Sequence, residues 1–132
     1  MITTTIRVRY AETDQMGVAY YANHFVWFEV ARGAFCRARG IDYIAMEADG
    51  LYLPIMEAKC RYKTPARYDD ELTVAVHVSR LTKRTVHFNY TVMRDGTLIA
   101  EGETTQMLVD AKGTPRAFPD DIAARFDSEQ AC

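Results

Sequence analysis

The segment between Tyr10 and His24 gathers the side chains best suited to chemistry. It carries two carboxylates, Glu12 and Asp14, and it leads into the start of a predicted helix. The first N–H groups of a helix have no partner inside the helix, so they can bind an anion or polarise a carbonyl. A carboxylate close to such donors can serve as a general base or a nucleophile. Alternatively, Asp14 only satisfies backbone donors of its own loop, as aspartate often does in turns.

Other polar side chains near this segment are weaker candidates. Glu12 can be a loop cap or a solvated charge. Glu29 falls inside the predicted helix, where pairing with Arg32 or with a loop group is the structural interpretation. His24 fits a packing or binding position at the helix start better than it fits a base. The three histidines lack metal-ligand spacing, so we expect no metal site. Neither serine lies in a Gly-x-Ser-x-Gly elbow, which argues against a serine hydrolase.

Hydrophobic periodicity predicts the elements that must position these residues. Apolar residues alternate with polar ones in the strands and follow a helical spacing after the loop. The expected order is strand Ile2–Tyr10, helix Asn23–Arg39, a short helical turn at Tyr43–Ala48, strands Tyr52–Lys63, Leu72–Ser79, Val86–Met93 and Leu98–Asp110, and a terminal helix at Pro119–Phe126.

Single residues mark the bends and ends of the first elements. We expect Gly17 at the sharp bend of the loop, Asn23 as the N-cap of the long helix and Gly40 as its C-terminal glycine. Gly33, inside this helix, lowers its stability by roughly 1 kcal/mol relative to alanine. Close approach of a neighbouring backbone would explain its presence.

The order of elements predicts an α+β fold, an antiparallel five-stranded sheet wrapped around one long buried helix. A sheet that covers one helix leaves its two edge strands unpaired. Such edges are commonly protected by pairing with another chain, so we expect a homodimer as the minimal unit.

Length and composition restrict the class of protein. The 132 residues fit one domain, 1–132. Sixteen basic and 18 acidic residues give a net charge of -2, which argues against a general nucleic-acid or anionic-membrane binder. No apolar run approaches the ~18 residues of a membrane span, and the N-terminus lacks a signal-peptide pattern. The three dispersed cysteines give no disulfide framework, and these features together favour a cytoplasmic location.

The run Tyr-x-x-Thr-Asp-x-x-Gly-x-x-Tyr-Tyr-x-Asn over Tyr10–Asn23 resembles hotdog-fold acyl-CoA thioesterases, most of all the 4-hydroxybenzoyl-CoA thioesterase family. The resemblance continues through Phe25–Arg32 and Ala66–Val74, and it covers the chain from about Ile6 to Val109. It implies a hotdog fold and hydrolysis of an acyl-CoA thioester without a metal or redox cofactor. It also implies a site shared between subunits, and homotetramers are frequent among hotdog proteins, so we expect a homotetramer.

The resemblance also implies roles for individual residues. Asp14 matches the family's catalytic aspartate, which acts as a nucleophile on the carbonyl or as a base on water. Tyr21 matches the residue at the helix N-terminus whose backbone N–H contacts the thioester oxygen. Gly17 matches the glycine that lets the loop turn toward the substrate.

The densest basic stretch of the chain is Ser79–Thr85, at a predicted hairpin turn. The family places contacts to the nucleotide phosphates of coenzyme A in the matching segment. Lys83 and Arg84, with Arg80 behind them, are therefore the candidate phosphate ligands, since lysine and arginine suit phosphate. The alternative is an ordinary solvated turn.

Other functions remain open at this stage. One is a hotdog protein that binds an acyl thioester without hydrolysing it, and another is a thioesterase that acts on acyl-carrier protein. A hydratase on the same fold fits less well, because those enzymes generally use a different His/Asp arrangement. The sequence does not indicate which acyl group is bound.

Overall fold

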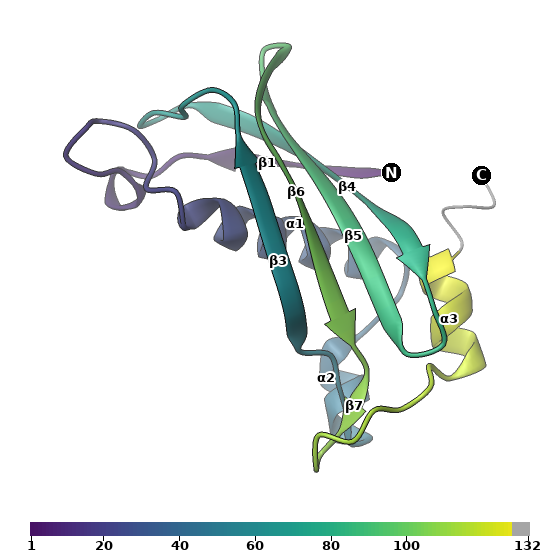
Figure 1. Ribbon diagram of the computed structural model, residues 1–132. Coiled ribbons are helices and arrows are strands. Elements are labelled where there is room, and N and C mark those ends of the chain that lie inside the picture. The colour runs from purple at the N-terminus through teal and green to yellow at the C-terminus, as the bar shows by residue number, and fades with distance from the viewer. Residues whose placement is uncertain (128–132) are drawn as a thin grey trace.

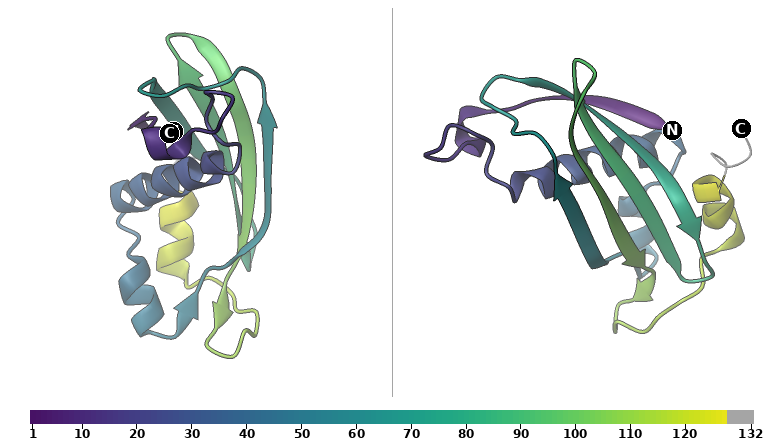
Figure 2. Two further views of the ribbon diagram at one scale, coloured as in Figure 1. Left: turned by 90° about the vertical axis from the view of Figure 1, so that its left-hand side faces the viewer. Right: turned by 45° about the horizontal axis from the view of Figure 1, so that its top comes forward.

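An antiparallel sheet that curves around one long helix dominates the computed structural model, which describes residues 1–127 (Figure 1). The five strands stand in the order β1-β4-β5-β6-β3, with bounds β1 Ile2–Arg7, β3 Ile55–Tyr62, β4 Glu71–Leu81, β5 Thr85–Arg94 and β6 Thr97–Met107. The remaining elements are η1 Tyr10–Glu12, α1 Asn23–Ala38, α2 Tyr43–Ala48, β2 Leu51–Tyr52, β7 Val109–Asp110 and α3 Asp120–Asp127. The views in Figure 2 place the three α-helices on the same side of the sheet. The predicted α+β fold with five antiparallel strands around one long helix is confirmed.

Helix α1 is buried because its apolar residues meet the inward-facing residues of the strands. Trp27, Phe28 and Phe35 are almost completely inaccessible, and the alternating valines and aromatics of β4 and β5 pack against them. Phe28 stacks on Tyr90 of β5 with 4.4 Å between ring centroids. It also needs glycine at position 102 of β6, since a Cβ there would lie 2.5 Å from the Phe28 ring. The helix is therefore fixed against the middle of the sheet.

The ends of α1 match the predictions only in part. Gly40 has a φ of +72°, as expected of a glycine that ends a helix. Asn23 is the first helical residue rather than the N-cap, and its side chain donates to the carbonyl of Glu12 instead. Gly33 does not face a neighbouring backbone in the described residues, because the atom closest to its would-be Cβ belongs to the Arg37 guanidinium. Both of these predictions were wrong.

Two predicted strands are each interrupted once. Pro54 separates β2 from β3, so the expected strand Tyr52–Lys63 becomes two, and Leu108 separates β6 from β7. The two short pieces pair with each other in a separate two-stranded sheet. Pro54 has no N–H to donate to a ladder, which fits an interruption at this position of the edge strand.

Strand β3 is an unpaired edge of the sheet and is exposed along nearly its whole length. On α1, close by, Val26 and Val30 are each 44% exposed. Met56 of β3 is 58% exposed. An apolar helix face beside a bare strand edge is the arrangement that pairing with another chain would cover.

The described part of the chain contains no helix that combines the length and apolarity of a membrane span. Cys36 and Cys60 are free thiols. Ser128 and Cys132 lie outside the described residues.

Candidate active site

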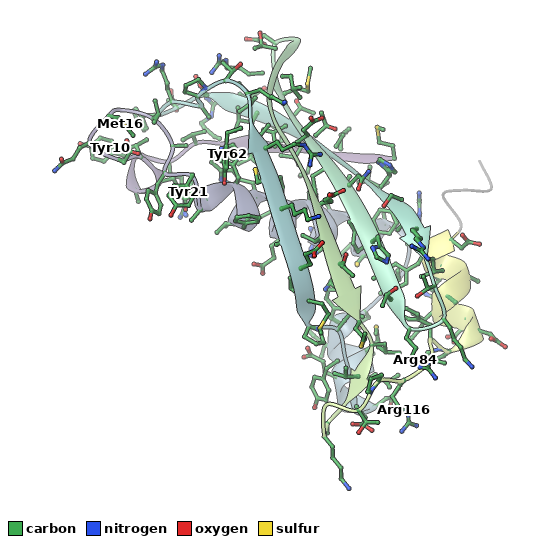
Figure 3. The ribbon with its side chains drawn as sticks, viewed as in Figure 1. Tyr10, Met16, Tyr21, Tyr62, Arg84 and Arg116 are labelled. Carbon is green, nitrogen blue, oxygen red and sulfur yellow. The ribbon has the colours of Figure 1, made fainter. Side chains whose placement is uncertain are left out.

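A cavity of about 310 Å³ opens where the loop before α1 meets the end of β3. Its walls are mainly aliphatic and aromatic, with a few polar groups among them. The lining residues are Asp14, Met16, Val18, Ala19, Tyr21, His24, Tyr62, Lys63, Thr64, Pro65 and Ala66. The structure thus brings together Asp14 and Tyr21, which the sequence analysis singled out. Figure 3 shows Met16, Tyr21 and Tyr62 at this end of the molecule.

Asp14 occupies a tight turn and is half-buried. Its Oδ1 accepts the N–H of Met16 at 2.9 Å, and its backbone carbonyl accepts the N–H of Gly17 at 3.0 Å. Gly17 has a φ of +77°, which residues with a Cβ rarely adopt, so the predicted bend is confirmed. No donor in residues 1–127 contacts Oδ2 of Asp14. One carboxylate oxygen of Asp14 therefore satisfies a backbone donor of its own loop. The other oxygen is available for chemistry.

The backbone N–H of Tyr21 is aimed away from α1. In a trans peptide the C=O and N–H point in opposite directions. The Tyr20 carbonyl accepts the N–H of Asn23 at 2.9 Å, so it points into the first turn of α1. The Tyr21 N–H of the same peptide consequently points outward, and no acceptor in the described part of the chain receives it. An unpaired donor at the N-terminus of a 16-residue helix suits a developing negative charge.

Glu12 has a different environment although it is close to Asp14 in the chain. It is only 4% exposed, and it accepts hydrogen bonds from the Trp27 indole at 3.0 Å and the Arg9 N–H at 2.8 Å. Burial alone would raise the pKa of Glu12. The hydrogen bonds from Arg9 and Trp27, together with the Arg9 charge, outweigh burial and lower this pKa. Glu12 therefore fastens the loop to α1 and is not the solvated charge considered above.

Tyr62 of β3 connects the sheet to the helix start, and its sequence context gave no indication of this. Its hydroxyl donates to the carbonyl of Tyr21 at 2.9 Å. Burial raises the pKa of Tyr62, so the hydroxyl keeps its proton and remains a donor at neutral pH. The ring also meets His24 edge to face, with 5.0 Å between centroids. The contact between Tyr62 and Tyr21 joins segments that are distant in the sequence, so only the folded structure reveals it.

Glu29 does not join this cavity. It lies on the exposed side of α1, beside an apolar groove of about 280 Å³ that also includes Phe25 and Ile55. The predicted partner Arg32 donates to the Tyr90 hydroxyl at 3.1 Å instead, so the interpretation of a Glu29–Arg32 pair was wrong. The structure thus separates Glu29 from Asp14 within one chain.

The basic hairpin lies at the opposite end of the sheet from Asp14. Near the Asp14 cavity, Tyr62 of β3 pairs with Ala100 of β6. At the hairpin that carries Lys83 and Arg84, Val86 of β5 pairs with Gln106 of β6, which also pairs with Ile55 at the other end of β3. Figure 3 shows the same separation between Tyr62 and Arg84. Lys83 and Arg84 are exposed at the hairpin, as expected, and Arg80 is exposed as well. One chain alone does not bring the cations to the Asp14 cavity.

Within residues 1–127, no group of three or more His, Cys, Asp or Glu side chains is placed to hold a metal ion. His87 on β5 uses both ring nitrogens on hydroxyls, those of Thr85 at 3.1 Å and Thr105 at 3.0 Å.

Comparison with known proteins agrees with this geometry. Residues 8–126 match the thioesterase-like superfamily. The acyl-CoA thioester hydrolase YbgC of Escherichia coli O6:H1 is 30% identical over 123 residues, which are 92% of each chain. A hypothetical protein from Aquifex aeolicus has a TM-score of 0.91 at 31% identity and covers 96% of this chain and 99% of its own. The DHNA-CoA thioesterase of Staphylococcus aureus has a TM-score of 0.92 at 29% identity, covering 98% of this chain and 90% of its own. The chain therefore belongs to the thioesterase-like superfamily and is a thioester hydrolase with the hotdog fold.

Proposed function

We propose that this protein hydrolyses an acyl-CoA thioester to a free acid and CoA, with Asp14 as the catalytic carboxylate. One observation carries this assignment: the unpaired oxygen of Asp14 and the unpaired N–H of Tyr21 belong to residues that line the same cavity. The first can attack or activate water, and the second can stabilise the oxyanion that attack creates. The names of the E. coli and S. aureus relatives support CoA as the carrier.

Two routes satisfy the chemistry. In the nucleophilic route, Oδ2 of Asp14 bonds to the carbonyl carbon, CoA thiolate leaves, and water hydrolyses the resulting anhydride to regenerate the carboxylate. In the general-base route, Asp14 takes a proton from water as the water oxygen attacks, and that proton then passes to the departing thiolate. In both, the carbonyl oxygen becomes negative beside the N–H of Tyr21. Neither route needs a metal or redox cofactor, because thiolate leaves readily.

The working unit in this proposal is a dimer joined along β3. An antiparallel pairing of two β3 strands about a two-fold axis reverses the ends of the second sheet relative to the first. The basic hairpin of one chain then reaches the same end of the joined sheet as the Asp14 cavity of its partner. Lys83 and Arg84, with Arg80 behind them, would there hold CoA phosphates bound at the other subunit's site. Association of two such dimers would give the expected homotetramer.

Thiol release from a panel of acyl-CoA thioesters tests the activity. The panel includes acetyl, hexanoyl, palmitoyl, benzoyl and 4-hydroxybenzoyl thioesters, each assayed with wild type and Asp14→Asn. The proposal expects release with at least one thioester and its loss in the variant. An Asp14→Asn enzyme with normal turnover on every accepted thioester would show that Asp14 is not the catalytic group.

A substrate carried on acyl-carrier protein is the second candidate, and the YbgC name does not support it over CoA. The same assay with acyl-carrier-protein thioesters decides between the carriers. Binding of acyl-CoA without thiol release from either carrier would instead identify a protein that only binds thioesters.

A further inference from the structure

His24 is a buried polar side chain on the wall of the cavity that the proposed reaction leaves unused. It stands in the first turn of α1 and is only 3% exposed. Its Nδ1 is buried and has no hydrogen-bond partner in the described residues. A buried polar group without a partner is uncommon in a native protein, and it calls for a ligand or an ordered water.

The His24 ring is held in place by its neighbours. Tyr62 presents its ring edge to face at 5.0 Å, and Trp27 contacts the ring at 4.5 Å between centroids. Tyr62 is itself tied to the Tyr21 carbonyl, and Trp27 is tied to Glu12. The imidazole therefore has a fixed position beside the helix start and cannot turn out to solvent for a partner.

The imidazole is neutral at physiological pH, because burial lowers the pKa of His24 to about 4. A neutral imidazole offers one N–H donor and one acceptor nitrogen. It is thus equipped to bind a neutral polar group such as a hydroxyl or a carbonyl, and it has no charge with which to select a carboxylate or a phosphate. The aromatic neighbours of its ring, Tyr62 and Trp27, use their own polar atoms on Tyr21 and Glu12. They therefore leave the imidazole to a group in the cavity that His24 lines.

We propose that His24 is a specificity residue that hydrogen-bonds a hydroxyl or carbonyl on the acyl part of the substrate. This inference rests on the proposed thioesterase function and adds a substrate class to it, acyl groups with a polar substituent that reaches the ring. Without a substrate, a water molecule can make that hydrogen bond. An unsubstituted acyl group displaces the water without replacing its hydrogen bond, and this lowers its affinity relative to a substituted one.

Matched pairs of thioesters test the inference. We would compare butyryl-CoA with 3-hydroxybutyryl-CoA, and benzoyl-CoA with its three hydroxybenzoyl isomers, using kcat/KM. In wild type, at least one hydroxylated thioester should exceed its unsubstituted partner by about 10-fold, the scale of one buried hydrogen bond. His24→Phe keeps the ring contacts and removes both nitrogens, so the ratio should fall to about 1. This fall should come from the hydroxylated member, with the unsubstituted member nearly unchanged.

Further variants separate recognition from packing. His24→Gln and His24→Asn restore a donor near Nε2 and Nδ1 respectively, and one of them should recover part of the ratio. His77→Phe, on the opposite face of the sheet, is the matched control and should leave the ratio unchanged. Equal loss on both members of every pair in His24→Phe, with a lower melting temperature, would assign His24 to packing and overturn the inference. A wild-type ratio of about 1 in all pairs would also overturn it.

Affinities of thioether analogues of the same pairs, measured by calorimetry, keep this test separate from catalysis. If wild type releases no thiol but still prefers the hydroxylated analogue through His24, the thioesterase proposal fails and the recognition inference stands. If thiol is released and neither assay shows the preference, the recognition inference alone fails.

Discussion

Glu12 and Asp14 are neighbouring carboxylates in one loop, yet the structure gives them opposite environments. Glu12, at the base of the loop, is buried, and its carboxylate accepts bonds from the backbone N–H of Arg9 and from Trp27. Asp14, at the tip, has one oxygen in a turn and the other directed to no donor among residues 1–127. A carboxylate whose hydrogen-bonding capacity is satisfied stabilises the fold, whereas an unsatisfied one beside a cavity can react.

The comparison shows how one short segment divides two tasks. Glu12 holds the loop to α1 through Trp27, and its carbonyl accepts the N–H of Tyr20 at 2.7 Å and the side chain of Asn23 at 2.8 Å. These contacts fix the peptide that carries the Tyr21 N–H. Asp14 can then be placed by a turn alone, without bonds that would use up its second oxygen. Variants at the two positions should therefore affect different measurements.

Asp14→Asn should have the largest effect on turnover. Asparagine keeps an oxygen for the N–H of Met16 but loses the negative charge needed for attack or proton transfer. We expect kcat to fall by at least ~10²-fold, the usual scale for a positioned acid–base group, with the melting temperature nearly unchanged. Steady-state kinetics measures the expected fall in kcat, and thermal denaturation of the same preparations checks that the melting temperature is unchanged. A comparable loss of stability would place Asp14 with Glu12 and end the distinction between them.

Glu12→Gln should have the opposite profile. A neutral amide cannot match a carboxylate as acceptor for Arg9 and Trp27, so we expect a loss of roughly 1–3 kcal/mol in the free energy of unfolding at pH 7. The pKa of Glu12 is lowered on folding from an ordinary value of 4.5. Its contribution is therefore complete above about pH 4.5 and declines as the pH falls through the lower folded value.

Urea unfolding of wild type and Glu12→Gln at several pH values measures this dependence. The difference between the two proteins should be constant from pH 6 to 8 and should shrink below pH 4.5. Glu71→Gln is a suitable control, because Glu71 is an exposed carboxylate paired with Arg7 at 2.9 Å, and such surface pairs contribute little. If the difference in free energy of unfolding between wild type and Glu12→Gln did not change with pH, the shape of the Glu12 side chain and not its charge would stabilise the loop.

A complementation experiment extends the comparison to the far end of the sheet. If the hairpin cations serve the partner's site, Asp14→Asn chains mixed with Lys83→Gln/Arg84→Gln chains form dimers with one intact site. Each cation contributes up to about 1 kcal/mol at an exposed site, so the double variant alone should raise KM by roughly 10-fold, less at high salt. Refolding the mixture should restore wild-type KM in a fraction of the sites. No recovery would place the phosphate contacts elsewhere.

The sequence predicted what depends on neighbouring residues and missed what depends on distant ones. The long helix, most of the strand pattern and the bend at Gly17 follow from local patterns, and the structure confirms them. Asp14 and Tyr21, which the family resemblance indicated, line the same cavity. Tyr62 was missed because its contact with Tyr21 joins positions 41 apart, and no pattern within β3 signals it. The Glu29–Arg32 pairing was wrong for a related reason, since a buried tyrosine from β5 offers Arg32 a partner that helical spacing cannot reveal.

Tyr62→Phe should give the smallest effect and the sharpest view of how the oxyanion donor is held. The variant keeps the ring against His24 and removes only the hydroxyl that donates to Tyr21. That bond orients the peptide after Tyr21, so its loss should loosen the donor without touching the substrate. One hydrogen bond of about 0.5–1.5 kcal/mol corresponds to a fall of roughly 2- to 10-fold in kcat, with KM unchanged.

Tyr68→Phe removes a hydroxyl from an exposed tyrosine that does not line the cavity, and it should leave kcat unaltered. A rise in KM for Tyr62→Phe with normal kcat would show that its hydroxyl contacts the substrate, and would move Tyr62 from the support of the site into the site itself.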